Sequence, residues 1–356
     1  EFSASNPTAP PLLEVNIPIG LGFRDNPGAI VNRSYVENSA DENVGLEVAP
    51  GKNLTFVGGN INFEAGEATA KGGNIELGGL SAAGIVGIND DGSLNFPEDV
   101  ERADITLSNG ADVDVRGTGG GSITVNARNL NLKAGDFGSS FLKAGITANS
   151  TSVDAQAGNI IIDVAENITL NDSRITNQVN SEGVGNSGNI IISTASLEAT
   201  NGGDVDASTF GRGNAGTVQI TATDTITFDG EDLEGFNSGA TSQVASKAEG
   251  NAGNIDIQAH SLFLKNNAQL TSSSKGQGNA GNVTLKATDN IFLTSSSKIT
   301  SNIGNFEGVS AVGKVGNISL QAKQVTLTDG ANLQAGFFSN ARGEAGINSV
   351  QGEDSI

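Results

Sequence analysis

The chain contains no cysteine, no methionine and no tryptophan, and it has a single histidine, His260. Without cysteine it can form no disulfide, no thiolate nucleophile and no cysteine-ligated zinc or iron–sulfur site. One histidine excludes a histidine-rich metal site. No run of about 18 apolar residues occurs, so we expect no membrane span. The sequence begins Glu-Phe with no initiator Met or signal peptide, and we therefore expect a trimmed form whose targeting must be inferred.

Basic residues are also scarce. The 19 lysines and arginines are outnumbered by 40 aspartates and glutamates, which gives a net charge of −21. A nucleic-acid partner needs clustered cations to displace counterions, so this balance argues against nucleic-acid binding. The negative net charge also argues against binding to anionic lipid. An acidic surface is typical of a soluble protein that is rich in strands and must not aggregate.

The hydrophobic content of 36% and the aromatic content of 4% are low for a globular core of this length. A solenoid needs only a thin core of Ile, Val and Leu. Six of the seven prolines lie within residues 1–50, and the last is Pro97. Because proline cannot donate to a sheet, we expect residues 1–50 to be a partly irregular segment and residues 51–356 to be a repetitive body.

One sequence pattern recurs along that body. Ala252–Leu285 shows three short runs of alternating apolar residues, then a Gly/Asn loop, and then the same start again at Ala280-Gly281-Asn282. Alternation of period two predicts strands with one buried face, and the restart predicts one coil of a solenoid. The glycines that open such a unit are Gly73, Gly121, Gly158, Gly188, Gly216, Gly253, Gly281 and Gly316. The sequence therefore predicts an all-β solenoid with loop insertions.

Two kinds of motif recur in a known family: three amino-terminal stretches, Phe2–Leu13, Ile17–Phe23 and Asn26–Asn32, and the repeats Gly-Asn-Ala-Gly-Asn and Asp329–Ala335. The stretches resemble the end of the secretion domain of cyanobacterial filamentous-haemagglutinin-like proteins, and the repeats resemble the body of the same proteins. The resemblance implies a single right-handed parallel β-helix that is exported by two-partner secretion through an outer-membrane transporter. It also implies a role in surface adhesion or extracellular structure. The Asn-Pro-Asn-Leu-type motifs of that family are absent and would lie upstream of Glu1.

Six asparagines share one position of the repeat, directly after its glycine. In stacked coils they would lie about 4.8 Å apart, with their amides hydrogen-bonded along the axis. We interpret them as a structural ladder that carries no chemistry. They are Asn74, Asn159, Asn189, Asn254, Asn282 and Asn317.

Two Asp-Val-Asp pairs are the candidates for catalysis. Asp112/Asp114 and Asp204/Asp206 would each place two carboxylates on one outer face, roughly 7 Å apart, which suits glycoside hydrolysis. Arg116 and Arg212 are the cations near them in sequence. The simpler interpretation is that these aspartates are outward charges that keep sheet surfaces from pairing.

The insertion after Phe228 carries an acidic cluster. Its oxygen ligands could hold Ca²⁺, although the spacing matches no EF-hand or Asp-rich nonapeptide, and a solvated acidic loop is the alternative. The members are Asp229, Glu231, Asp232 and Glu234. We expect no other cofactor. Five phenylalanines in or beside loops could contact sugars or a partner, but packing beneath their own loops is the preferred interpretation. They are Phe210, Phe236, Phe306, Phe337 and Phe338.

The leading functional prediction is a secreted, non-enzymatic β-helical adhesin or extracellular structural component. Its expected contacts are a host or neighbouring-cell surface or glycan, and further copies of itself, because interrupted end coils would stack head to tail into fibres. The alternative from another class is a polysaccharide-active enzyme that uses the paired aspartates. A calcium-dependent surface-layer or matrix component is a third possibility.

Overall fold

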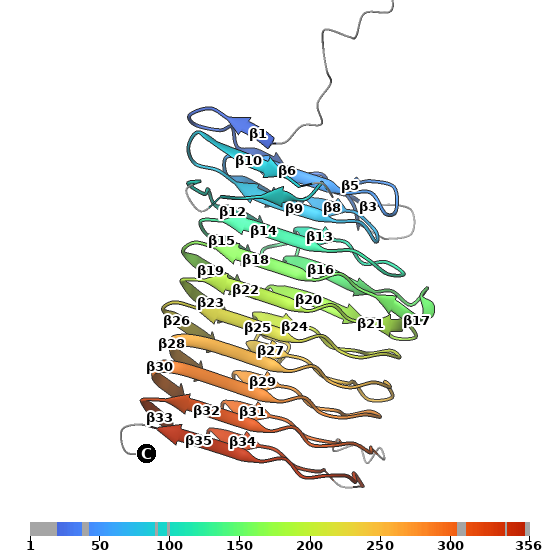
Figure 1. Ribbon diagram of the computed structural model, residues 1–356, viewed down its shortest axis with the longest axis vertical. Coiled ribbons are helices and arrows are strands. Elements are labelled where there is room, and N and C mark those ends of the chain that lie inside the picture. Colours follow the sequence, from blue (N-terminus) through green and yellow to red (C-terminus); the bar gives the residue numbers. More distant parts are fainter. Residues whose placement is uncertain are drawn as a thin grey trace, which may run out of the picture.

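Three long faces wind around a narrow apolar core and build an elongated stack, as the computed structural model shows (Figure 1). The structure describes residues 20–37, 43–89, 92–97, 100–304, 311–338 and 340–352. Across these ranges the regular structure is all strand, and no helix is long and apolar enough to cross a membrane. The predicted all-β parallel β-helix with loop insertions is confirmed. The alternating sequence Leu13-Glu-Val-Asn-Ile17 also predicts a strand, and it lies outside the described residues.

Faces 1 and 2 together form the 18-stranded sheet, because β28 and β30 turn the corner between them without a break. Face 1 consists of β6 (Leu54–Gly58), β9 (Ile75–Gly79), β14 (Ile123–Ala127), β18 (Ile160–Val164), β22 (Ile190–Thr194), β25 (Val218–Ala222), the first halves of β28 (Ile255–Lys265) and β30 (Val283–Leu293), β32 (Ile318–Ala322) and β35 (Asn348–Gly352). Face 2 consists of β2 (Ile30–Asn32), β7 (Ile61–Glu64), β12 (Ile105–Ser108), β15 (Leu130–Lys133), β19 (Asn167–Asn171), β23 (Ser196–Thr200), β26 (Thr225–Asp229), the second halves of β28 and β30, and β33 (Gln324–Leu327).

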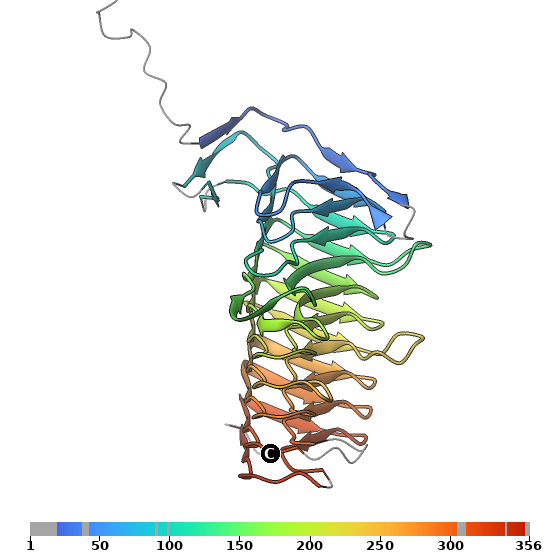
Figure 2. The same ribbon diagram turned by 90° about the vertical axis from the view of Figure 1, so that its right-hand side faces the viewer.

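Face 3 is the 10-stranded sheet, and it is parallel throughout. Its strands are β5 (Leu46–Glu47), β8 (Glu67–Thr69), β13 (Asp112–Asp114), β16 (Phe141–Ile146), β20 (Arg174–Val179), β24 (Asp204–Asp206), β27 (Gly239–Thr241), β29 (Gln269–Thr271), β31 (Lys298–Thr300) and β34 (Asn332–Gln334). Figure 2 shows the three faces edge-on, with loops projecting where one face turns into the next.

Smaller sheets decorate this stack. At its amino-terminal end, β1 (Gly20–Phe23), β10 (Gly84–Ile88) and β11 (Leu94–Asn95) form an antiparallel sheet. The pair β3 (Val36–Glu37) and β4 (Asn43–Val44) is antiparallel, and the pair β17 (Thr151–Gln156) and β21 (Val184–Asn186) is parallel. β10 and β11 lie in a long excursion between β9 and β12, after which the chain returns to the stack.

The alternating apolar residues build the core as the sequence indicates. In one coil Ile255 faces inward from face 1, Leu262 from face 2 and Leu270 from face 3, each at most 1% exposed. Each pairs in register with an apolar residue of the coils before and after it, for example Val218, Ile255 and Val283. Because every inner position continues a column of similar side chains, one thin core runs along the whole stack.

The coils approach each other most closely at the glycine that opens face 1. A Cβ atom on Gly253 would lie 2.1 Å from the carbonyl oxygen of Gly216, and one on Gly281 would lie 2.0 Å from that of Gly253. That space is too small for any side chain. The same carbonyl of Gly253 accepts a hydrogen bond of 2.7 Å from the Oγ of Ser272 on face 3, inside the coil. Glycine is therefore required here for close approach.

We expect Gly253→Ala to lower the free energy of unfolding by about 1–3 kcal/mol, because its methyl group would push two coils apart. Gly336→Ala is the matched control, since a Cβ atom there meets nothing within 4 Å. Chemical denaturation followed by circular dichroism measures both variants. Equal stability of the two alanine variants would contradict the close-approach argument.

Candidate functional site

The six predicted ladder asparagines lie one above another at the corner that opens face 1. Their side-chain oxygens accept hydrogen bonds from the main chain of the next coil. The Oδ1 of Asn254 accepts from the N–H of Asn282 at 2.9 Å, and the Oδ1 of Asn282 accepts from the N–H of Asn317 at 2.8 Å. Asn74, Asn159, Asn189 and Asn317 accept in the same way. Each of these hydrogen bonds joins a backbone N–H group to a side-chain oxygen, whereas we expected the side-chain amides to bond to one another.

A second asparagine ladder runs beside the first and was not foreseen. The Oδ1 of Asn214 accepts from the N–H of Asn251 at 2.9 Å, and the Oδ1 of Asn251 accepts from the N–H of Asn279 at 3.0 Å. Asn186 and Asn279 extend it by one step at each end. The signal was present in the Gly-Asn-Ala-Gly-Asn sequence, which contains two asparagines per coil. Both ladders serve the stacking of coils.

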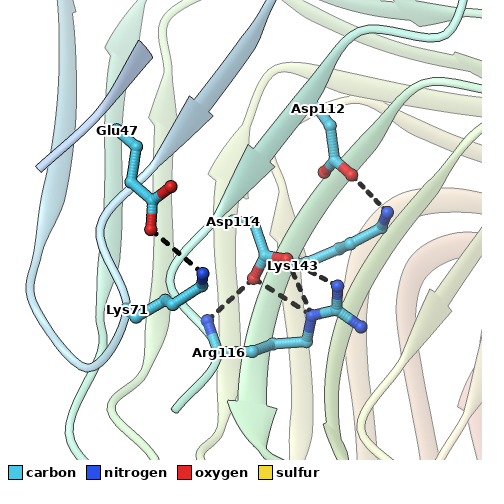
Figure 3. A network of polar contacts seen from close by, with 6 residues as sticks. All are labelled: Glu47, Lys71, Asp112, Asp114, Arg116 and Lys143. Carbon is cyan, nitrogen blue, oxygen red and sulfur yellow. Dashed lines mark hydrogen bonds and ion pairs between the residues drawn. The ribbon is translucent and has the colours of Figure 1, made fainter. Parts of the chain in front are cut away.

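Face 3 gathers the charges that the sequence singled out. Its outer side carries a first carboxylate group of Glu67, Asp112 and Asp114, which lie on adjacent strands β8 and β13. The Nζ of Lys143 on β16 forms an ion pair and hydrogen bond with Oδ2 of Asp112. Asp114 is held by Arg116, whose Nε lies 3.0 Å from both carboxylate oxygens (Figure 3). Each aspartate therefore has its own cation.

The second carboxylate group consists of Asp204 and Asp206 on β24. Asp204 is the register partner of Arg174 on the preceding coil. Asp206 is 9% exposed and accepts hydrogen bonds from Gln178 and Ser208. Arg212, which lies nearest in sequence, pairs instead with Glu249 at 3.2 Å. The cation beside Asp204 therefore comes from the preceding coil, because parallel strands stack in register.

The expectation that these aspartates are outward, solubilising charges is wrong in one respect. They do lie on the outer side of the coil, but their neighbours cover them. Burial raises the pKa of Asp204 well above its ordinary value, and the charge of Asp206 raises it further, while Arg174 opposes the shift. Burial also raises the pKa of Asp206 and of Asp112, and hydrogen bonds from Ser208 and Gln178 oppose it at Asp206.

The acidic insertion folds back onto Arg174, the register partner of Asp204. The Nη2 of Arg174 donates to Oδ2 of Asp232 at 3.1 Å. The Oδ1 of Asp232 accepts hydrogen bonds from the main-chain N–H groups of Glu234 and Phe236. The Arg174 guanidinium stacks 4.3 Å from the centre of the Phe236 ring. An arginine of β20 thus fixes the insertion, a link that the sequence did not reveal.

The four acidic side chains proposed for calcium do not converge. Asp229 accepts from the Nδ2 of Asn266 at 2.7 Å, and Glu231 from the Nδ2 of Asn237 at 3.4 Å, while Asp232 faces Arg174. Over the described ranges no three histidine or carboxylate side chains are grouped closely enough to hold a metal ion. A cation at Asp232 would have to compete with the guanidinium. Calcium binding stays a prediction that only a binding experiment can test.

Residues 1–125 match the family model of the TPS secretion domain. This part of the chain is therefore similar to the secretion domain of two-partner secretion proteins. A TPS secretion domain implies an outer-membrane transporter as partner and export to the cell surface or the extracellular space. No curated protein and no solved structure matches the chain.

The TPS match extends past residue 50 and ends within β14. Strands β2 and β5, which precede residue 50, already pair with β7 and β8 of the long sheets. The stack therefore continues through the end of the matched region into the repeats. The division of the chain at residue 50 stays a prediction, as does a cyanobacterial origin.

The outer side of face 2 holds an aromatic pair that the sequence did not bring forward. Phe263 and Phe292 are register partners on β28 and β30, with ring centroids 6.4 Å apart. The same outward column continues through Thr227 to an open polar hollow of about 530 Å³. That hollow is lined by side chains of successive coils, among them Asn131, Thr169, Glu198 and Thr227. Alternation with Leu262 and Leu264 was the signal that could have placed Phe263 outside.

Among the described loop phenylalanines, Phe210, Phe236 and Phe337 lie in three different loops of the stack. Phe236 and Phe210 are 49% and 37% exposed, and Phe337 is 38% exposed. Phe306 lies outside the described residues. Phe236 stacks on Arg174 of β20, as stated above, so this ring packs against the side of the stack. Packing of the other rings beneath their own loops stays a prediction.

We expect Asp204→Asn to stabilise the protein at pH 7. The folded-state pKa of Asp204 is raised, so its ionised form costs stability at neutral pH, and this cost disappears as the pH falls through the folded pKa towards the unfolded one. The advantage of the variant should therefore shrink between pH 7 and pH 4. Urea unfolding at several pH values measures it.

Asp104→Asn is the control with the opposite sign. A hydrogen bond from Arg128 lowers the pKa of Asp104, so this carboxylate stabilises the fold above its unfolded pKa and loses that effect as the pH falls. Its variant should be less stable than the wild type at pH 7. A loss of stability in both variants at pH 7 would contradict the burial argument for Asp204.

Proposed function

We propose that this two-partner secretion substrate is a non-enzymatic rod that acts outside the cell as an adhesin or extracellular structural component. The single observation that supports this is the uninterrupted stacking of three faces, in which every coil adds length and outer surface. A stack of this kind is quasi-one-dimensional, because each coil contacts only its neighbours. Length and a repeated surface are therefore what the fold supplies.

The outer side of face 2 is the surface we propose for contact with glycans on a neighbouring cell. Aromatic rings offer a flat apolar platform for the C–H face of a sugar, and amide, hydroxyl and carboxylate groups bind its hydroxyls. Phe263 and Phe292 provide the rings, and the column from Thr227 to Asn131 provides the polar groups. The repeat spacing along the column suits a polymer better than a single small molecule.

The double variant Phe263→Ala/Phe292→Ala should bind immobilised polysaccharides about tenfold more weakly, which corresponds to ~1.4 kcal/mol. The probes are a panel of acidic and neutral polysaccharides, measured by surface plasmon resonance. Phe137→Ala is the control, because Phe137 is 65% exposed but lies in the loop between β15 and β16, outside the strands of face 2. Unchanged binding in the double variant, or an equal loss in the control, would refute glycan contact through face 2.

The enzymatic alternative depends on the raised pKa of Asp204 and Asp206, which is the property a general acid needs at neutral pH. Against it, Asp206 already accepts from Ser208 and Gln178, and the 229–238 insertion covers the neighbouring Arg174. Polysaccharide turnover by the wild type that disappears in Asp204→Asn would replace the adhesin proposal with this one.

Self-association remains part of the proposal and needs a separate experiment. Sedimentation velocity across a wide concentration range distinguishes isolated rods from fibres. A single monomeric species at the highest concentration would remove head-to-tail assembly from the proposed function while leaving adhesion intact.

A further inference from the structure

Within the first cluster of carboxylates on face 3, one amine and two carboxylic acids lie together and are largely buried. The amine is Lys143 and the first acid is its ion-pair partner Asp112, with side chains 21% and 18% exposed. Glu67 lies beside Asp112 in direct register on β8 and is 8% exposed. These three groups belong to three successive coils of the stack.

The other charged groups near Lys143 and Asp112 already have partners of their own. Asp114 receives both Nε and the main-chain N–H of Arg116, so Lys143 is left to Asp112 (Figure 3). The other oxygen of Asp112, Oδ1, is buried and meets no hydrogen-bond donor among the described residues. The ring of Phe141 lies 4.4 Å from Nζ of Lys143 and shields the amine from water on one side.

We propose that Lys143 and Asp112 form an isopeptide bond, with Glu67 as the acid that assists it. The bond would join β13 to β16. Asp112 lies within the region that matches the TPS secretion domain and Lys143 lies beyond it, so the cross-link would fasten the secretion domain to the first coil that follows.

The reaction balances without any co-reactant. The ammonium of Lys143 passes a proton to the carboxylate of Asp112, which converts the ion pair into a neutral amine and a neutral acid. The Nζ atom then attacks Cγ of Asp112, a C–N bond forms, a C–O bond breaks, and one water leaves. Glu67 donates a proton to the departing oxygen and recovers one from the nitrogen, so it ends as it began.

Three features of the site favour this condensation, which water normally opposes. Holding the two groups in contact supplies an effective concentration that reaches about 10⁵–10⁸ M in well-oriented intramolecular reactions. Burial favours the neutral pair over the ion pair. Burial, followed by the charge of Asp112, also raises the pKa of Glu67, which shifts this group towards its protonated form.

The test is the intact mass of the full chain, denatured after purification and again after a week at 37 °C. The wild type should contain a population about 18 Da lighter than the sequence mass, the mass of one water. Trypsin should release a species in which residues 103–116 are joined to residues 134–174, because cleavage after Lys143 is blocked. Lys143→Arg keeps the ion pair and should remove both signals.

Two further variants separate the roles of the residues. Glu67→Gln keeps the shape of the side chain but cannot transfer the proton, so the cross-linked fraction formed in a given time should fall at least about tenfold. Lys71→Arg is the matched control, because Lys71 pairs with Glu47 at 3.0 Å but is 57% exposed, and this variant should stay cross-linked like the wild type.

The proposal is overturned if the wild type keeps its full sequence mass at both times. It is equally overturned if the lighter mass persists in Lys143→Arg without the joined tryptic species, since aspartate–glycine sites can also lose water through succinimide formation. Circular dichroism of Lys143→Arg verifies that the variant folds. Formation at an unchanged rate in Glu67→Gln would remove Glu67 from the proposal and leave the bond itself.

Discussion

Close approach of successive coils at one corner is the constraint on which the remaining structure depends. A Cβ atom on the glycine that opens face 1 would lie 2.1 Å (Gly253) or 2.0 Å (Gly281) from a carbonyl oxygen of the preceding coil, so only glycine fits there. The asparagine that follows uses its side-chain oxygen to bind the next coil's main-chain N–H at the same corner. Glycine permits the contact and asparagine satisfies the polar group exposed there. The register of all three faces follows from this corner, because each coil restarts in the same position.

The acidic character of the chain has a structural cost that parallel stacking helps to offset. In a parallel stack, chemically equivalent positions lie directly above one another, so a repeated aspartate would face its own copies. Face 3 instead places Arg174 in register with Asp204, and it pairs Lys143 with Asp112 of the preceding coil. Where two carboxylates do share a strand, as at Asp204 and Asp206, the pKa of each is raised by burial.

The repeat and its inward residues could be predicted from the sequence because period-two alternation depends only on strand geometry. Ile255, Leu262 and Leu270 belong to the three alternating runs of Ala252–Leu285, and all three face the core. Partners on other coils could not be predicted, since insertions make the spacing between coils uneven. Arg174, rather than Arg212, accompanies Asp204 for this reason. The outward pair Phe263 and Phe292 depends on the same inter-coil register.

Hydrogen exchange of the main-chain N–H of Asn282 tests the central claim most directly. This amide sits at an exposed corner next to a loop, yet it donates to Oδ1 of Asn254 at 2.9 Å. NMR-detected exchange should therefore show it protected in the wild type, and Asn254→Ala should accelerate its exchange without unfolding the neighbouring coils. Fast exchange of this amide in the wild type, or no change in the variant, would contradict the account of how the coils are held together.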